Sequence, residues 1–168
     1  MKRRVLLTFV TVAAVVAAIV IAGCGGSGGG NGQATYGGGT TTAANAGGTT
    51  TVALKKLKDG TALVDGQGRT LYLFEADKGD TSTCNGACAS VWPPDTTSAK
   101  PMAGPGIDAA KLGTTKRADG VLEATYNGHP LYRYAADAKP GQDAGQGLNQ
   151  FGAKWYVLAA TGSKIDDD

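Results

Sequence analysis

Alternation of apolar and polar positions predicts a mostly β domain between residues 52 and 165. Short runs rich in Val, Leu, Thr and Tyr are separated by Asp-Gly, Asn-Gly and single glycines, which supply the positive φ that tight turns need. These strand-like runs lie at residues 52–57, 61–65, 70–75, 111–117, 121–126, 129–135 and 154–160. No stretch keeps an apolar period of 3.6 residues over three turns, so the pattern predicts no long helix.

One seven-residue stretch occurs twice in this domain, and the two copies are sixty residues apart. Residues 71–77 read Leu-Tyr-Leu-Phe-Glu-Ala-Asp, and residues 131–137 read Leu-Tyr-Arg-Tyr-Ala-Ala-Asp. The same offset relates the Asp-Gly turns at residues 59–60 and 119–120. A fixed offset over about twenty residues indicates one unit built twice. We therefore predict two pseudo-symmetric, antiparallel, three-stranded meanders that pack as a small sandwich or open barrel.

The N-terminal segment, residues 1–23, has the pattern of an export signal. Basic residues at positions 2–4 precede an apolar run from Val5 to Ile21, which is at the short limit for a membrane-spanning helix. The run ends in Ile21-Ala22-Gly23-Cys24, which resembles the lipobox of bacterial lipoproteins. This resemblance implies cleavage before Cys24, a diacylglyceryl thioether on its sulfur, and often a fatty acid such as palmitate on its nitrogen. An uncleaved signal anchor with a chance cysteine is the alternative.

Residues 24–51 are predicted to form a flexible tether behind the lipidated cysteine. The segment is almost entirely Gly, Thr, Ala, Ser and Asn, and such a composition buries too little apolar surface to fold. Its root-mean-square span is about 30 Å. The chain is therefore predicted to be anchored in the cell membrane, with its domain on the extracytoplasmic side, at the cell surface or in the periplasm. Residues 166–168 form a short acidic tail.

Charge argues against a nucleic-acid partner. The whole chain carries 16 basic and 14 acidic residues, for a net charge of +2. Three of the basic residues lie in the export signal, so its removal leaves 13 basic against 14 acidic residues. No basic field is left to hold a phosphate backbone.

Cys84 and Cys88 remain as a pair once Cys24 is acylated. An even pair of cysteines in an exported chain favours a disulfide. One helical turn would place their Cα atoms about 6 Å apart, and residues 84–91 are predicted to form such a turn before Pro93-Pro94 ends it. Two alternatives stay open. A thiol at a helix N-terminus has a lowered pKa, which suits a redox-active pair. A metal site, with copper the first candidate, could be completed by Met102 or His129.

Aromatic residues recur two positions apart in both copies, which places them on one face of a strand. Core packing is the ordinary interpretation of such rings. A face that stacks sugars, quinones or another flat ligand is the alternative. The residues of this candidate ligand face are Tyr72, Phe74, Trp92, Tyr132, Tyr134 and Trp155.

Polar residues give little sign of catalysis. Asp77 and Asp137 each follow a strand, where a carboxylate can cap the coming turn. A catalytic pair would require the two carboxylates to converge. His129 is the only histidine of the chain and directly follows a turn. No Ser-His-Asp order, metalloprotease helix, P-loop or dinucleotide fingerprint is present, so the sequence favours a non-enzymatic role without a cofactor.

Together these features resemble the bacterial lipoproteins that carry secreted repeats of unknown function. That family has a Tyr-x-(Phe/Trp/Tyr)-x-x-Asp motif, which occurs here at residues 72–77 and 132–137. Its first repeat runs on to Cys-x-x-x-Cys-Ala and Trp-Pro-Pro, and its second ends in a Gly-rich loop and Trp-Tyr. The corresponding segments here are residues 84–89, 92–94, 145–152 and 155–156. The resemblance implies this architecture and supplies no catalytic residue.

Three functions are compatible with these patterns. The leading hypothesis is a non-enzymatic, lipid-anchored envelope domain that binds a ligand or a protein partner through its aromatic face. The first alternative is an extracytoplasmic thiol-redox or copper-handling accessory protein that uses Cys84 and Cys88. The second alternative is a purely structural envelope lipoprotein.

Overall fold

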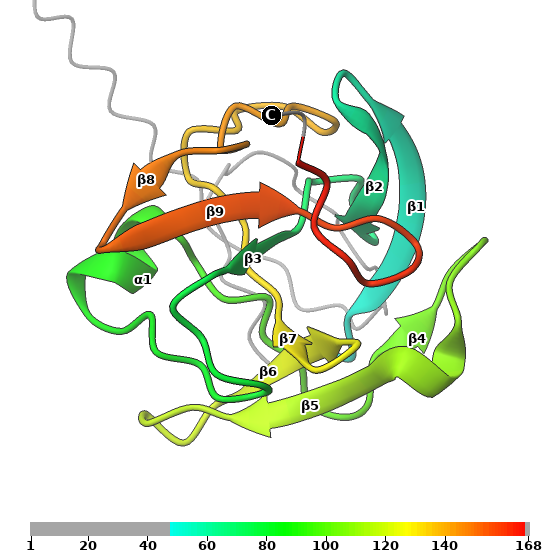
Figure 1. The fold of residues 1–168 in the computed structure, drawn as a ribbon. Coiled ribbons are helices and arrows are strands. Elements are labelled where there is room, and N and C mark those ends of the chain that lie inside the picture. The colour runs from blue at the N-terminus through cyan, green and yellow to red at the C-terminus, as the bar shows by residue number, and fades with distance from the viewer. Residues whose placement is uncertain (1–47, 167–168) are drawn as a thin grey trace, which may run out of the picture. The chain divides into compact units, whose positions relative to one another are not determined.

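The computed structural model describes residues 48–166, which are mostly β (Figure 1). The predictions for residues 1–23, for Cys24, for most of the tether and for the last two residues of the tail lie outside this range. The strands are β1 (Thr51–Leu57), β2 (Gly60–Asp65), β3 (Tyr72–Phe74), β4 (Met102–Ala103), β5 (Leu112–Lys116), β6 (Leu122–Tyr126), β7 (His129–Pro130), β8 (Asn149–Gln150) and β9 (Ala153–Val157). The helical segments are α1 (Ala87–Val91), which is the turn predicted near the cysteine pair, and a 3₁₀ turn at Ala109–Lys111. Between residues 48 and 166, no helix has the length and apolarity needed to span a bilayer.

The second repeat forms the predicted antiparallel meander from β5, β6 and β7. Leu112 of β5 lies opposite Tyr126 of β6, and Tyr126 also pairs with His129 of β7. The turn between β6 and β7 is Asn127-Gly128, and both residues have positive φ, 51° and 79°. This is the backbone conformation that Asn-Gly favours in a two-residue hairpin.

The first repeat pairs its strands differently. β1 and β2 form a hairpin from Val52 opposite Asp65 to Leu57 opposite Gly60, and β4 lies parallel to β1. Thr70, just before β3, makes a single bridge to Val64 of β2, and β3 itself pairs along its length with β9. All of β3 and the last three residues of β9 are buried, so their pairing satisfies backbone groups inside the core. The mostly β fold with three-stranded antiparallel sheets is confirmed and is consistent with a small sandwich.

The two repeats meet at equivalent residues. The amide of Tyr72 donates to the carbonyl of Tyr132 at 2.8 Å, and the amide of Tyr132 donates to the carbonyl of Tyr72 at 3.0 Å. An antiparallel pair that exchanges both hydrogen bonds has a local two-fold axis between its residues. The duplication in the sequence is therefore also a symmetry of the fold at this point.

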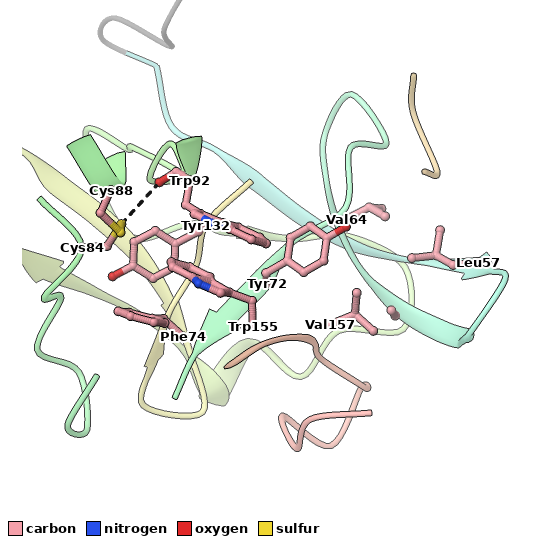
Figure 2. Close-up of a cluster of buried hydrophobic side chains, with 11 residues drawn as sticks. Leu57, Val64, Tyr72, Phe74, Cys84, Cys88, Trp92, Tyr132, Trp155 and Val157 are labelled. Carbon is pink, nitrogen blue, oxygen red and sulfur yellow. Dashed lines mark hydrogen bonds between the residues drawn. A yellow bond between two sulfur atoms is a disulfide. The ribbon is translucent and has the colours of Figure 1, made fainter. Parts of the chain in front are cut away.

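The core consists of two clusters of buried side chains separated by β3 and β9. Successive residues of a strand point to opposite faces. Tyr72 and Phe74 therefore enter one cluster with Trp155, whereas Leu73 enters the other with Tyr156. The first cluster contains most of the aromatic rings and the cysteine pair (Figure 2).

Candidate functional site

The six aromatic residues of the candidate ligand face are packed largely against one another. Tyr72, Trp92, Tyr132 and Trp155 are 0% exposed, and Phe74 is 4% exposed. Tyr134 is the exception among the six and is half-buried. Five of the rings therefore form the interior of the domain rather than an open stacking surface.

Four of the rings form one continuous stack. Ring centroids are 4.4 Å apart between Tyr134 and Trp92, 4.0 Å between Trp92 and Trp155, and 4.1 Å between Trp155 and Phe74. Phe74 and Tyr134 occupy the same position of the motif, so the stack begins and ends on equivalent residues. Gln150 holds both indoles, because its side-chain oxygen accepts from Trp92 Nε1 at 2.9 Å and its carbonyl accepts from Trp155 Nε1 at 3.1 Å.

The glycine-rich loop closes over this stack. Gly145 lies so near the ring of Trp92 that a Cβ added there would be 2.7 Å from the ring atom Cη2. Its amide donates to the hydroxyl of Tyr72 at 3.3 Å. A side chain at this position would therefore push the loop away from the aromatic core, which explains the glycine.

The motif tyrosine of each repeat donates to the motif aspartate of the other repeat. The hydroxyl of Tyr72 donates to Asp137 Oδ2 at 2.6 Å, and the hydroxyl of Tyr132 donates to Asp77 Oδ2 at 2.7 Å. Burial raises the pKa of both tyrosines, and nearby carboxylates raise it further. Both hydroxyls therefore stay protonated and act as donors.

The same aspartates also bind the loops that follow them. Asp77 Oδ1 accepts from the amide of Thr83 at 2.8 Å, and Asp137 Oδ1 accepts from the amide of Ala144 at 3.0 Å. Such bonds are the turn-capping role expected of a carboxylate after a strand. Each aspartate thus joins its own loop to the tyrosine of the opposite repeat, and neither is hydrogen-bonded to the other aspartate.

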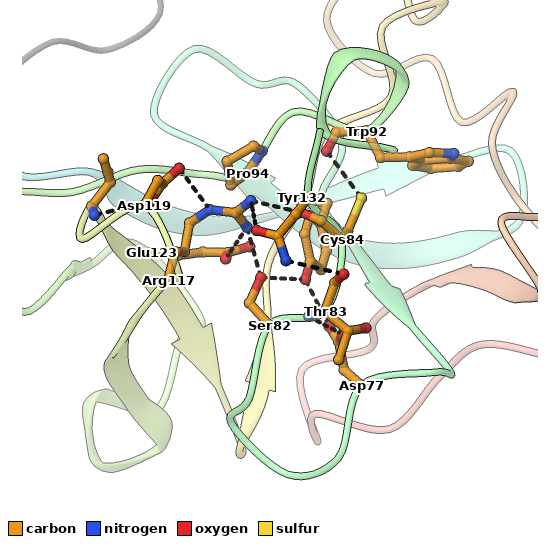
Figure 3. Close-up of polar contacts among 12 residues, drawn as sticks. Asp77, Ser82, Thr83, Cys84, Trp92, Pro94, Arg117, Asp119, Glu123 and Tyr132 are labelled. Atoms are coloured by element: carbon orange, nitrogen blue, oxygen red, sulfur yellow. Dashed lines mark hydrogen bonds and ion pairs between the residues drawn. The ribbon is translucent and has the colours of Figure 1, made fainter. Parts of the chain in front are cut away.

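A buried ion pair that the sequence pattern did not single out lies beside the cysteine loop (Figure 3). Arg117 Nη1 and Glu123 Oε2 are 2.7 Å apart, and their side chains are 1% and 0% exposed. Arg117 also donates to Ser82 Oγ and to the carbonyl of Cys84, both at 2.6 Å. Ser82 Oγ lies 2.7 Å from the hydroxyl of Tyr132. This network ties the second repeat to the loop that follows the first.

Cys84 and Cys88 form the predicted disulfide, with Cα atoms 5.2 Å apart. Both are buried, at 1% and 7% exposure. Thiol–disulfide exchange requires an accessible sulfur, so this environment favours a structural bond over a redox-active pair. A disulfide also removes the thiolates that a metal ion would need.

The other predicted metal ligands lie on separate strands. Met102 is exposed on β4, and His129 is half-buried on β7. Among the residues that the structure describes, no group of three or more His, Cys, Asp and Glu side chains is placed to hold a metal ion. With the cysteines joined to each other, the geometry gives no support to a copper site.

Tyr134 lines a surface cavity of about 450 Å³, which we call the Tyr134 cavity. It forms where the loop after the first repeat meets the end of the second motif. Its wall includes Arg69, Ser90, Pro93, Arg133, Tyr134 and Asp137. A larger hollow of about 690 Å³ lies beside the glycine-rich loop, but none of the six aromatic residues of the candidate ligand face lines it. A cavity of about 420 Å³ is lined by Phe74 at the other end of the stack, but that ring is only 4% exposed. The Tyr134 cavity is the one at the half-buried end.

Comparison with known proteins agrees with this two-fold organisation. The family model described as a secreted repeat of unknown function matches residues 53–95 and 113–159, one segment for each repeat. Searches of curated proteins and of solved structures find no significant match. The two matched segments include both motifs and together cover more than half of the chain. The chain therefore belongs to the family of secreted repeats of unknown function.

Proposed function

We propose that this chain is a lipid-anchored, extracytoplasmic binding protein without catalytic activity, and that its ligand or partner docks in the Tyr134 cavity. One observation carries this proposal: Tyr134 is the half-buried member of an otherwise interior aromatic stack, and it lines a cavity. Small-molecule sites are usually concave, aromatic or apolar, and of about 300–1,000 Å³. The cavity volume of about 450 Å³ lies in that range.

The cavity stands on a rigid support. The ring of Tyr134 rests on Trp92, and the indole N–H of Trp92 is held by Gln150. Cys88 and the α1 turn lie just before Trp92, and the disulfide fixes that loop. A binding surface built on locked side chains loses little conformational entropy when a ligand arrives.

The motif residues that would be the first candidates for catalysis are used by the fold. Tyr72 and Tyr132 donate to carboxylates, and the oxygens of Asp77 and Asp137 accept from loop amides and tyrosine hydroxyls. Groups held in this way stabilise the contact between the repeats. This arrangement supports a binding role over an enzymatic one.

The lipid anchor rests on the sequence before the domain. Ile21-Ala22-Gly23-Cys24 has the pattern of a lipobox, and two or three acyl chains hold a protein on a membrane where one does not. A secreted family and a disulfide are both consistent with an extracytoplasmic, oxidising compartment.

Replacement of Cys24 by serine is expected to release the chain from the membrane fraction. Serine cannot form the thioether, so the change removes the acyl chains without touching the domain. Fractionation of cells followed by intact-mass measurement would check this. Cys84→Ser is the matched control and should leave the chain in the membrane fraction. A mass without acyl chains for the wild-type protein would contradict the lipid anchor.

A fragment screen tests the binding site. Full-length chain in detergent micelles would be titrated with neutral, anionic and cationic aromatic fragments and followed by amide chemical shifts. We expect the shift changes to concentrate at Ser90, Arg133 and Ala135. We expect Tyr134→Ala to weaken fragment binding about tenfold, because a lost aromatic contact costs on the order of 1 kcal/mol or more. Phe151→Ala is the matched control, since that ring is 48% exposed on a different turn. Fragments of every charge that leave the cavity amides unshifted would contradict the proposal.

A further inference from the structure

Two cationic side chains line the Tyr134 cavity. Arg69 and Arg133 both line it, and both side chains are half-buried. The pKa of Arg133 is lowered first by burial and next by the positive charge of Arg69. Both guanidinium groups thus line one cavity, and their like charges repel each other where water screens them only partly.

The internal partners of these arginines leave donors unused. Arg69 Nε contacts Asp65 Oδ2 at 2.6 Å, and Arg133 Nη2 donates to the carbonyl of Pro94 at 3.0 Å. The Nε of Arg133 is buried and has no hydrogen-bond partner within residues 48–166. A guanidinium carries five N–H donors, and a buried donor left unpaired is destabilising.

The nearby carboxylates already serve other groups. Asp95 is buried and accepts from Thr50 Oγ1 at 3.0 Å, and burial raises its pKa to about 6 although the positive charge of Arg133 opposes that shift. Asp137, which also lines the cavity, accepts from Tyr72 and from the amide of Ala144. Asp65 accepts from the amides of its own turn as well as from Arg69.

Neither arginine belongs to the scaffold that the repeats share. The sixty-residue offset places Arg133 at the position of Leu73, which is buried in the core, and Arg69 at the position of His129. Arg117 is a useful contrast, because it also replaces a leucine of the first repeat, Leu57. Its Nη1 and Nη2 donate to a carboxylate, a hydroxyl and a carbonyl inside the fold. Arg133 lines a cavity, and its one side-chain hydrogen bond within residues 48–166 goes to a backbone carbonyl, so it is placed for a ligand instead.

From these observations we infer that the Tyr134 cavity binds a small anion, a carboxylate or phosphate group carried on an apolar or aromatic body, between Arg69 and Arg133. Planar guanidinium forks match the oxygens of carboxylate and phosphate, and Tyr134, Pro93 and Ala135 offer apolar wall for the body of the ligand. The inference rests on the proposed function and names the class of its ligand.

Calorimetric titration of the full-length chain with benzoate, phenyl phosphate and benzamide tests this inference at low ionic strength. Benzamide has nearly the shape of benzoate without its charge. We expect both anions to bind about tenfold or more tightly than benzamide, since hydrogen bonds to charged groups contribute at least that much. Arg133→Gln and Arg69→Gln should each remove that preference. Lys56→Gln, which deletes an exposed cation of β1, is the control for net charge and should not change it.

The outcomes separate the two proposals. Equal binding of benzoate and benzamide, or an anion preference that survives Arg133→Gln, would overturn the anion inference and leave a ligand site at Tyr134 standing. Failure of all three probes would also overturn the anion inference. The fragment screen described above then decides whether the cavity binds any ligand. If Arg133→Gln lowers the melting temperature, Arg133→Lys is the second variant to test. A single ammonium keeps the positive charge but loses the planar fork of donors. Arg133→Lys should therefore weaken the binding of both anions and leave the binding of benzamide unchanged.

Discussion

Replacement of Arg117 by leucine is expected to lower the free energy of unfolding by about 3–5 kcal/mol, because it leaves a charged partner buried alone. Glu123 is 0% exposed, and its Oε2 has the guanidinium 2.7 Å away. The same change removes the donors to Ser82 and to the carbonyl of Cys84, so the cysteine loop loses two of its hydrogen bonds to the second repeat. Urea unfolding followed by tryptophan fluorescence would measure the loss.

The first repeat supplies a matched control for this prediction. Leu57 and Leu63 stand where the second repeat has Arg117 and Glu123. The double replacement Arg117→Leu/Glu123→Leu removes both charges together, and exchange of a buried ion pair for apolar residues is often neutral or stabilising. We therefore expect the double variant to be more stable than Arg117→Leu alone. A single variant that costs less than about 1 kcal/mol, or a double variant that is the less stable of the two, would contradict this account.

Burial of Glu123 also has a pH consequence within this network. Burial raises the pKa of its carboxyl to about 7, although the guanidinium of Arg117 opposes that shift. A raised pKa in the folded state means that protonation favours folding, so this group contributes its stability at low pH and loses it as pH rises through about 7. In Arg117→Leu the opposing cation is gone, so the pKa of the Glu123 carboxyl in the folded state rises further. The loss of stability with rising pH should therefore be larger in this variant and extend to higher pH.

The repeat and its strands could be predicted from sequence, because both depend on local patterns. Period-two alternation and Asp-Gly or Asn-Gly turns place β1, β2, β5 and β6 with small errors at their ends. The strand predicted at residues 129–135 is shorter in the structure, where β7 covers only His129–Pro130 and Tyr132 makes isolated bridges. The pairing of β3 with β9 could not be predicted in this way, since residues 72–74 and 155–157 are far apart along the chain. A strand pattern shows which faces are apolar, but it does not name the neighbouring strand.

The same limit explains what was missed at the candidate site. Alternation places Tyr72 and Phe74 on one face, but it does not say that Trp92 and Trp155 from other segments cover that face. The five-residue separation of Tyr72 and Asp77 suggests a contact within one repeat, whereas the backbone pairing of Tyr72 with Tyr132 directs each hydroxyl to the opposite repeat. Only the local half of the aspartate's role, the capping of its own loop, can be inferred from its place after a strand.

One signal for the buried ion pair was present in the sequence. A charged residue in one copy that faces an apolar residue in the other is either exposed or paired, because an isolated buried charge is too costly. Arg117 and Glu123 both align with leucines of the first repeat. Two opposite charges at aligned leucine positions therefore point to each other, and comparison of the copies would have found them.

Replacement of Trp155 by alanine is expected to lower the free energy of unfolding by about 3–5 kcal/mol, the usual cost of removing a buried large aromatic ring. Trp155 lies between Trp92 and Phe74 in the stack, and the ring of Tyr132 meets it edge-on with centroids 5.2 Å apart. Trp155 is also the β9 residue opposite Phe74, so the void left by the deleted ring would lie where the first repeat pairs with the C-terminal strand. Urea unfolding with Trp92 as the remaining fluorophore would measure the change.

Trp155→Phe separates the packing of the ring from the rest of its role. Phenylalanine keeps an aromatic ring in the stack but cannot donate to the carbonyl of Gln150, so it should cost clearly less than Trp155→Ala. Because Trp155 and Tyr134 lie on opposite faces of Trp92 in one stack, the alanine variant should also weaken fragment binding at the Tyr134 cavity by loosening its support. Equal stability of the alanine and phenylalanine variants would mean that the stack is not what holds the two repeats together, and the support assigned to the cavity would fall with it.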